Sequence, residues 1–265
     1  MSVGKMSRSF DLIGSGDRLV AIVDLEGDSA EEIADKIMGT NRNVKSVLAK
    51  TSGRKGEFRK LGLKLVAGDK NTEVLHKEYG CFLRVDPQKA YFSPREATER
   101  QRIAEQVKDG ETILVMFGGV CTYSISIAKK KPRVEKIYSV ELNPEAHKYA
   151  ADNVRMNKLS HKIVPIVGDV KKVCKGFYGK CDRVVMPLPL GAGEFLGTAV
   201  KCLRPSGGIL NFYSVGEEED LFTKALETID KELKKIKRSY VVMDKKPVLP
   251  YAPRQMKIRI DVMVK

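Results

Sequence analysis

Two adjacent glycines and one glutamate carry the first chemical signal in this 265-residue chain. Gly118 and Gly119 directly follow a short apolar, β-branched run, and Glu141 ends a second such run about 20 residues further on, the offset of a βαβ ribose site. Glycine lets the backbone approach a ligand closely, and the N-terminus of the following helix offers free N–H groups. A carboxylate at this offset can accept both hydroxyl groups of a ribose. These residues therefore predict a nucleoside site.

The glycine spacing narrows the choice of nucleoside. The Gly-x-Gly-x-x-Gly turn that binds dinucleotides is absent, which argues against a pyrophosphate-containing ligand. S-adenosylmethionine is the leading candidate. Asp169 follows a third apolar run, and its carboxylate could accept a hydrogen bond from the adenine amine or could cap the next helix. Pro187, Leu188 and Pro189 follow a fourth run and predict a stiff loop, either an active-site wall or a simple helix stop.

The elements that must position these residues alternate regularly from residue 112 to the C-terminus. Alternating strand and helix patterns predict a mostly parallel sheet with helices on both faces, a Rossmann-like α/β domain over residues 93–265. Residues 1–92 predict a small α+β domain with several strands and one helix. Less regular segments predict a strand at 90–92, a helix at 217–236 and a final antiparallel hairpin from strands at 240–243 and 257–264.

Composition bounds the partners. Lys and Arg outnumber Asp and Glu by 48 to 34, a net charge of +14, which favours nucleic acid over the alternative of a lysine-rich thermophile surface. The five scattered cysteines and three histidines lack ligand spacing, so we expect reduced thiols and no metal site. There is no run of transmembrane length and no signal pattern, so we expect a cytoplasmic protein without membrane contact. With no coiled-coil pattern, a monomer is expected.

Several motifs, in this order, resemble one enzyme family, the archaeal and eukaryotic tRNA guanosine-37 N1-methyltransferases. The resemblance covers nearly the whole chain. It implies S-adenosylmethionine as the methyl donor, the tRNA anticodon stem-loop as the partner and N1 of guanosine 37 as the acceptor. The matching motifs are Ser93-Pro94-Arg95-x-x-x-Glu99-Arg100, Met116-Phe117-Gly118-Gly119-Val120, Val140-Glu141-Leu142-Asn143-Pro144, Gly168-Asp169-Val170, Met186-Pro187-Leu188-Pro189 and, upstream, Gly56-Glu57-Phe58-Arg59.

The resemblance implies a role for each matched residue. Guanine N1 must lose its proton before it attacks the methyl group, which calls for a general base and for a cation near O6. Glu99 would be the base and Arg59 the O6 partner, where the simpler alternatives are a solvated helix acid and a phosphate contact. The implied cofactor contacts are Phe117, Gly118, Gly119, Val120, Glu141, Leu142, Asn143, Gly168, Asp169, Val170, Pro187, Leu188 and Pro189. The basic residues Arg54, Lys55 and Lys60, which flank Arg59, are the candidate contacts for anticodon-stem phosphates, and Arg95 is a further candidate substrate contact. Tyr91, Phe92 or Tyr123 could stack on the target base, unless these side chains belong to the core.

Three positions depart from the family pattern. Val115 stands where the family usually has Asp, Cys121 where it has Gly, and Pro187 where it often has Asn. The first two would lie against the cofactor and bear on its affinity or pose. The small N-terminal domain with which many members grip the tRNA elbow is not evident.

Two other functions stay open. A wyosine-pathway aminocarboxypropyltransferase uses the same cofactor, but has a Gly-Tyr type sequence where this chain has Leu188-Pro189. A non-catalytic tRNA-binding protein would fit Val115 and Cys121. Whether the acceptor is guanosine or a wyosine precursor, and which tRNAs are modified, also stays open.

Overall fold

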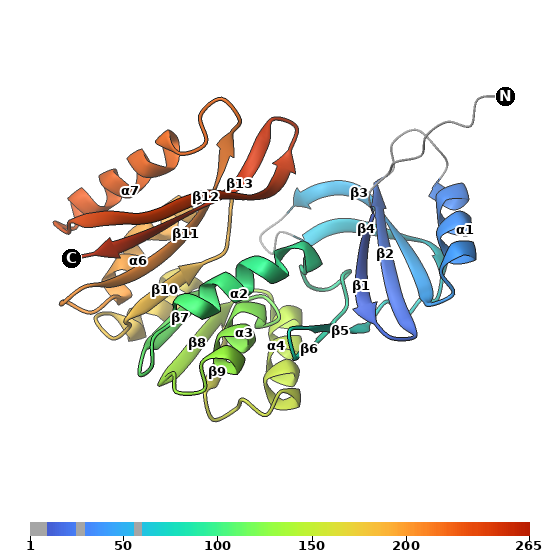
Figure 1. Ribbon diagram of the computed structural model, residues 1–265, viewed down its shortest axis with the longest axis horizontal. Coiled ribbons are helices and arrows are strands. Elements are labelled where there is room, and N and C mark those ends of the chain that lie inside the picture. The colour runs from blue at the N-terminus through green and yellow to red at the C-terminus, as the bar shows by residue number, and fades with distance from the viewer. Residues whose placement is uncertain (1–9, 25–29, 56–59) are drawn as a thin grey trace. The chain divides into compact units, whose positions relative to one another are not determined.

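The computed structural model describes residues 10–24, 30–55 and 60–265. The chain divides into two compact units, Met1–Pro94 and Arg95–Lys265 (Figure 1). The role that the sequence suggests for each unit stays a prediction.

The first unit contains a four-stranded sheet in the order β1-β2-β3-β4, namely Asp11–Ser15, Arg18–Asp24, Val44–Lys55 and Lys60–Gly68. β2 and β3 are parallel because α1 (Ala30–Thr40) makes the crossover between them. The buried residues Ala30, Ile33, Ala34 and Ile37 give α1 one apolar face, the spacing of an amphipathic helix. A hairpin of β5 (Val74–Glu78) and β6 (Cys81–Val85) completes this unit.

The strand expected at 90–92 is wrong. Residues 86–93 form turns and bends, and the Phe92 side chain is buried without strand pairing. Its ring meets the edge of His76, with the two ring centroids 4.9 Å apart. An apolar run of three residues can therefore be a buried loop as readily as a strand.

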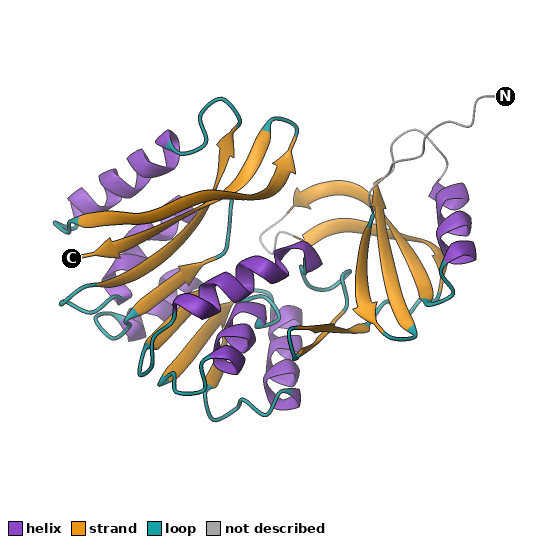
Figure 2. Ribbon diagram, viewed as in Figure 1, coloured by secondary structure: helices purple, strands orange, loops and turns teal. Residues whose placement is uncertain are grey.

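The second unit is built on a seven-stranded sheet (Figure 2). β7 (Thr112–Met116), β8 (Lys136–Glu141), β9 (Ile163–Val167), β10 (Arg183–Met186) and β11 (Gly208–Glu217) are parallel. β13 (Gln255–Val264) lies antiparallel between β11 and the edge strand β12 (Tyr240–Ala252), which confirms the final hairpin. The order across the sheet is β12-β13-β11-β10-β7-β8-β9.

Helices cover both faces of this sheet, as the alternating pattern predicts (Figure 1). One hydrophobic core joins alternate strand residues such as Leu114, Met116 and Leu210 to α5, α6 and α7. The helices are α2 (Ala97–Gln106), which follows a 3-10 turn at Pro94–Glu96, α3 (Thr122–Lys130), α4 (Pro144–Met156), α5 (Val170–Val173), α6 (Leu196–Cys202) and α7 (Thr223–Lys235); two further 3-10 turns are Cys174–Phe177 and Ala192–Phe195.

Two boundaries differ from expectation. β12 extends well beyond residue 243 and includes Pro247 and Pro250, which an edge strand tolerates because one row of its N–H groups has no ladder partner. The helix expected from residue 217 begins at Thr223, because β11 keeps pairing with β13 as far as Glu217.

Candidate functional site

The sheet reverses its order at β7. The chain runs outward through β8 and β9 and then returns to place β10 on the other side of β7. Ligands of such sheets bind at this switch point, beside the carboxyl ends of the strands. The turn after β7 and the loop after β10 both follow the carboxyl ends of these strands, so the residues predicted for cofactor binding lie at the switch point.

The turn from Phe117 to Cys121 is tightly wound. Phe117, Gly119 and Cys121 have φ values of 58°, 55° and 68°, all in the left-handed region. The N–H of Gly118 donates to Val140 O at 2.9 Å, and the N–H of Cys121 donates to Gly118 O at 2.9 Å. Each non-glycine in this region costs about 1–2 kcal/mol. Such strain is concentrated at functional sites more often than elsewhere.

Gly118 is required by packing on β8. A β-carbon at this position would collide with Ser139 Oγ and lie 3.3 Å from Ser139 Cβ. Ser139 is itself buried, so it has little room to move. Gly119 differs from Gly118 in that its N–H donates to the Glu141 carboxylate, and its predicted contact with a ligand stays a prediction.

Glu141 ties the two strand ends together. Its Oε2 accepts from Gly119 N at 2.8 Å and its Oε1 accepts from Asn143 N at 2.8 Å. Burial raises the pKa of this carboxyl, while the N–H groups of Asn143 and Gly119 act in the opposite direction. A carboxylate oxygen has two lone pairs, so each can still accept one ribose hydroxyl.

Asp169 caps a helix, as the alternative interpretation predicted. Its Oδ1 accepts from Lys171 N at 2.8 Å at the start of α5. Gly168, with φ 148°, donates its N–H to Glu141 O at 2.8 Å, which brings residues 168–170 next to Glu141. The hydrogen bond that the adenine amine would donate to the other carboxylate oxygen of Asp169 stays a prediction.

The remaining predicted cofactor residues surround the same strand ends. Asn143 caps α4 by accepting from Glu145 N at 3.0 Å. Phe117 is half-buried, and its ring meets the edge of Phe195 with the centroids 5.0 Å apart. The side chains of Val120 and Val170 are buried, so any ligand contact at these residues would come from the backbone. Leu142, Pro187 and Leu188 are half-buried, and Pro189 is buried.

Val115 and Cys121, the two departures from the family pattern, are both buried. Burial raises the pKa of the Cys121 thiol to about 12, so this thiol is neutral near pH 7 and is no nucleophile. Its left-handed backbone explains why a glycine would suit this position.

Replacement of Cys121 tests this backbone. We expect Cys121→Gly to be more stable than Cys121→Ala by about 1 kcal/mol, or about 3 °C in Tm, because only glycine adopts this φ without strain. Thermal unfolding followed by circular dichroism measures the difference. At the exposed Lys148 in the middle of α4, the same pair of substitutions should rank in the reverse order. An alanine at 121 as stable as glycine would contradict the left-handed turn.

Glu99 is not the solvated helix acid of the simpler interpretation. It is 8% exposed, and Arg102 donates to both of its oxygens, from Nη2 at 2.7 Å and from Nε at 2.9 Å. The Tyr213 hydroxyl also donates to Oε1, and Arg259 Nε lies 3.7 Å from Oε2. The carboxylate is thus held in a fixed orientation by groups from three elements.

Sequence reasoning missed these partners of Glu99. The available signal was β13, where Lys257, Arg259 and Asp261 alternate with apolar residues. That pattern normally means a solvated face, but these three side chains are at most 4% exposed.

The predicted substrate residues are less informative. Tyr91 is 39% exposed, and Arg95 is exposed at the start of the second unit. Arg59 lies outside the described residues, as do the side chains of Arg54, Lys55 and Lys60. Their roles stay predictions.

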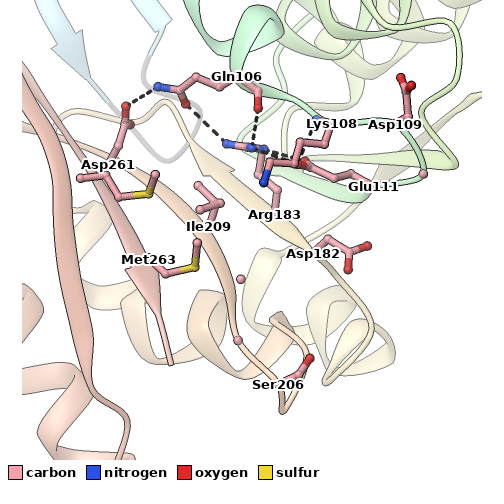
Figure 3. Close-up of a pocket in the computed structure, with 14 residues that line it drawn as sticks. Gln106, Lys108, Asp109, Glu111, Asp182, Arg183, Ser206, Ile209, Asp261 and Met263 are labelled. Atoms are coloured by element: carbon pink, nitrogen blue, oxygen red, sulfur yellow. Dashed lines mark hydrogen bonds and ion pairs between the residues drawn. The ribbon is translucent and has the colours of Figure 1, made fainter.

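A cavity of about 540 Å³ opens at the opposite edge of the sheet, by the amino ends of β7, β10 and β11 (Figure 3). Most of its charged side chains have ion-pair partners within the lining or beside it. Arg183 contacts Glu111 at 2.8 Å, and Arg204 contacts Asp182 at 2.6 Å. We therefore read it as a structural feature and not as the reaction site.

The described residues hold neither a metal-ligand group nor a membrane-spanning helix. Within the described residues, no group of three or more His, Cys, Asp or Glu side chains could hold a metal ion. All five cysteines lie within the described residues and are buried thiols outside any disulfide. No helix in the described parts of the chain is long and apolar enough to cross a membrane.

Comparison with known proteins identifies the family. Residues 74–242 match the model of the TRM5/TYW2 methyltransferase domain. The chain is 38% identical over 259 residues to the tRNA (guanine(37)-N(1))-methyltransferase Trm5b of Pyrococcus abyssi, covering 97% of this chain and 74% of that protein. This chain belongs to the TRM5/TYW2 methyltransferase family. The predicted resemblance is confirmed.

Two further proteins are similar to this chain over most of its length. Trm5b of Methanocaldococcus jannaschii is 34% identical over 98% of this chain and 72% of its own. A tRNA(Phe) (4-demethylwyosine(37)-C(7)) aminocarboxypropyltransferase of that organism is 28% identical over 93% of this chain and 94% of its own.

Solved structures of the family confirm the fold class. The crystal structure of Pyrococcus abyssi Trm5b has a TM-score of 0.84 and covers 97% of this chain and 75% of that one. A complex of aTrm5 with tRNALeu has a TM-score of 0.83 at 34% identity, covering 97% of this chain and 72% of that one.

Proposed function

We propose that this protein transfers the methyl group of S-adenosylmethionine to N1 of guanosine 37 in the anticodon loop of tRNA. The observation that carries the proposal is the 38% identity, over 97% of the chain, to a protein named for this reaction. The arrangement of Gly119 and Glu141 at the switch point is consistent with a nucleoside cofactor.

The cofactor would bind where the parallel strands end. Glu141 would accept the ribose hydroxyls, and the backbone of residues 117–120 would lie against the amino-acid part of the cofactor. Residues 168–170 would face the adenine, and the loop 187–189 would form the wall beside the reacting carbon. The bound cofactor supplies an electrophilic methyl group whose leaving group is a neutral thioether.

The protein's own contribution to the chemistry would come from Glu99 and Arg59. Glu99 would take the proton from guanine N1, and Arg59 would face O6, where negative charge develops. The contacts of Glu99 with Arg102 and Tyr213 support the assignment, since a positioned base must be held in one orientation.

Charge supports tRNA as the substrate. The net charge of +14 favours a polyanion, and Arg54, Lys55, Lys60 and Arg95 would contact phosphates. Tyr91, which is partly exposed, would stack on a base that has left its place in the anticodon loop.

A second candidate is aminocarboxypropyl transfer to a tricyclic base. The 28% identity to an enzyme of that name over most of both chains is the observation in its favour. The Leu188-Pro189 sequence favours methyl transfer instead.

One labelling experiment separates these functions. Unmodified tRNA transcripts and transcripts carrying the tricyclic base are incubated with donor labelled either in the methyl group or in the aminocarboxypropyl carbons. We expect methyl label in 1-methylguanosine and no second label in any transcript. Aminocarboxypropyl label in tRNA would favour the second candidate, methyl label in the tricyclic base alone would change the acceptor, and no label in any RNA would indicate a non-catalytic binder.

A further inference from the structure

A group of buried charged and polar side chains lies between α2, β11 and β13. We call Glu99, Arg102, Tyr213, Arg259 and Asp261 the Glu99 cluster. Arg102 is the most accessible of the charged members, with 21% of its side chain exposed, and Arg259 and Asp261 are at most 4% exposed. A buried charge needs a partner of opposite charge. The way in which the two guanidinium groups are shared between the carboxylates therefore decides which carboxylate can take up a proton.

The Asp261 carboxylate accepts hydrogen bonds from four side chains of the Glu99 cluster and its surroundings. Its carboxylate accepts from Arg102 Nη1 at 2.6 Å, Asn211 Nδ2 at 2.7 Å, Gln106 Nε2 at 2.9 Å and Arg259 Nη1 at 3.1 Å. Figure 3 shows Gln106 reaching Asp261 from one side. Four donors thus converge on a carboxylate that is 1% exposed.

Two guanidinium groups are shared between two carboxylates. Arg102 contacts Glu99 at 2.7 Å and Asp261 at 2.6 Å. Arg259 contacts Asp261 at 3.1 Å and lies 3.7 Å from Glu99. If Asp261 were neutral, Arg102 would be balanced by Glu99, and Arg259 by Asp244 together with Glu99. A carboxylate beside two guanidinium groups resists protonation.

We propose that Asp261 is a positioning residue that keeps Glu99 able to accept a proton, because it holds Arg102 and Arg259 on its own carboxylate. The proposal rests on the proposed role of Glu99 as the base. As N1 bonds to the methyl carbon, the bond from that carbon to the sulfonium sulfur breaks, its electron pair stays on the sulfur, and the N1 proton passes to Glu99. Arg102 and Arg259 then remain paired with Asp261, so neutral Glu99 leaves neither guanidinium buried without a counter-charge.

Two tyrosines near Glu99 stay neutral near pH 7. Burial raises the pKa of Tyr213 and that of Tyr123 well above their usual values, so both hydroxyls stay protonated. Arg259 is also balanced by Asp244 at 2.7 Å, whose side chain is 42% exposed. The remaining charged groups nearby are Arg100 on α2 and the buried ion pair of Glu96 with Lys257 at 2.8 Å.

The test is the pH profile of the single-turnover rate with saturating tRNA and S-adenosylmethionine. With Asp261→Asn, Glu99 would hold a proton less tightly, so the acid limb should move to lower pH by about one unit while the plateau rate falls. With Arg102→Gln, the limb should move to higher pH by a similar amount. Asp244→Asn is the matched control: it removes a partly exposed partner of Arg259 and should leave the limb within about a third of that shift.

The outcomes separate this inference from the proposed function. Glu99→Gln with an undiminished rate would remove the base assignment and this inference with it. An inactive Glu99→Gln, together with unshifted acid limbs in Asp261→Asn and Arg102→Gln, would overturn the inference alone. Circular dichroism and cofactor calorimetry confirm that each variant is folded, and the partly exposed Arg102→Gln decides the question should Asp261→Asn not fold.

Discussion

We expect Glu99→Gln to lower the single-turnover rate of methyl transfer by about 100- to 10,000-fold, the range of general acid–base catalysis, and to leave tRNA affinity within a few-fold. The amide has the shape of the carboxylate but cannot take the N1 proton. The side chain is buried and paired with Arg102 and Tyr213, so a loss of rate cannot come from a solvent-exposed surface change. Rapid-quench kinetics with labelled donor measure the rate, and filter binding measures tRNA affinity.

Glu105→Gln is the matched control for this prediction. Glu105 lies on the same helix, but its side chain is 61% exposed and lies 3.5 Å from Lys130. An exposed ion pair contributes little, so this variant should keep the full rate. If Glu99→Gln transferred methyl as fast as Glu105→Gln, the base would have to be sought elsewhere.

We expect Glu141→Ala to weaken S-adenosylmethionine binding by about 100-fold. The substitution would remove the proposed acceptor for both ribose hydroxyls, and two hydrogen bonds to a charged group correspond to about 3 kcal/mol. It also deprives the N–H groups of Gly119 and Asn143 of their acceptor, so the turn after β7 loses its tie to the end of β8. Isothermal titration calorimetry with cofactor alone measures the change without requiring tRNA.

The control for Glu141 is Glu145→Ala, in the first turn of the next helix. Glu145 pairs at 2.6 Å with Lys148, and its side chain is 40% exposed. Cofactor affinity should change less than about twofold, as expected for a surface pair. Equal affinities for Glu141→Ala and Glu145→Ala would show that the ribose does not bind at Glu141.

The parallel sheet could be predicted because each of its strands is a local apolar run. Thr112–Met116 and Lys136–Glu141 are short and buried on both faces, so periodicity alone located them. Strands that contain polar residues or prolines were harder to predict from the sequence. β12 continues through Pro247 and Pro250 because it pairs with β13, a non-local contact that no local pattern encodes.

The positions of Gly118 and Glu141 at neighbouring strand ends could be predicted for the same reason, and their cofactor contacts stay a prediction. Gly118 and Glu141 are fixed by their offsets from two strand ends, and the structure joins those ends through the Glu141 carboxylate and Gly119 N. The surroundings of Glu99 could not be predicted. Tyr213 is 114 positions away from Glu99, and Arg102 and Asp261 are separated by 159. From the sequence alone, the charged residues of β13 predict a solvated face. Only the structure shows that α2 contacts them.

A crystal structure of the protein with S-adenosylmethionine tests the central claim most directly. We predict adenosine density at the carboxyl ends of β7 and β8, with the ribose hydroxyls within hydrogen-bond distance of the two Glu141 oxygens and the sulfonium beside the loop 187–189. Cofactor bound at another place on the sheet, or an empty crevice at a concentration that saturates the protein in calorimetry, would contradict it.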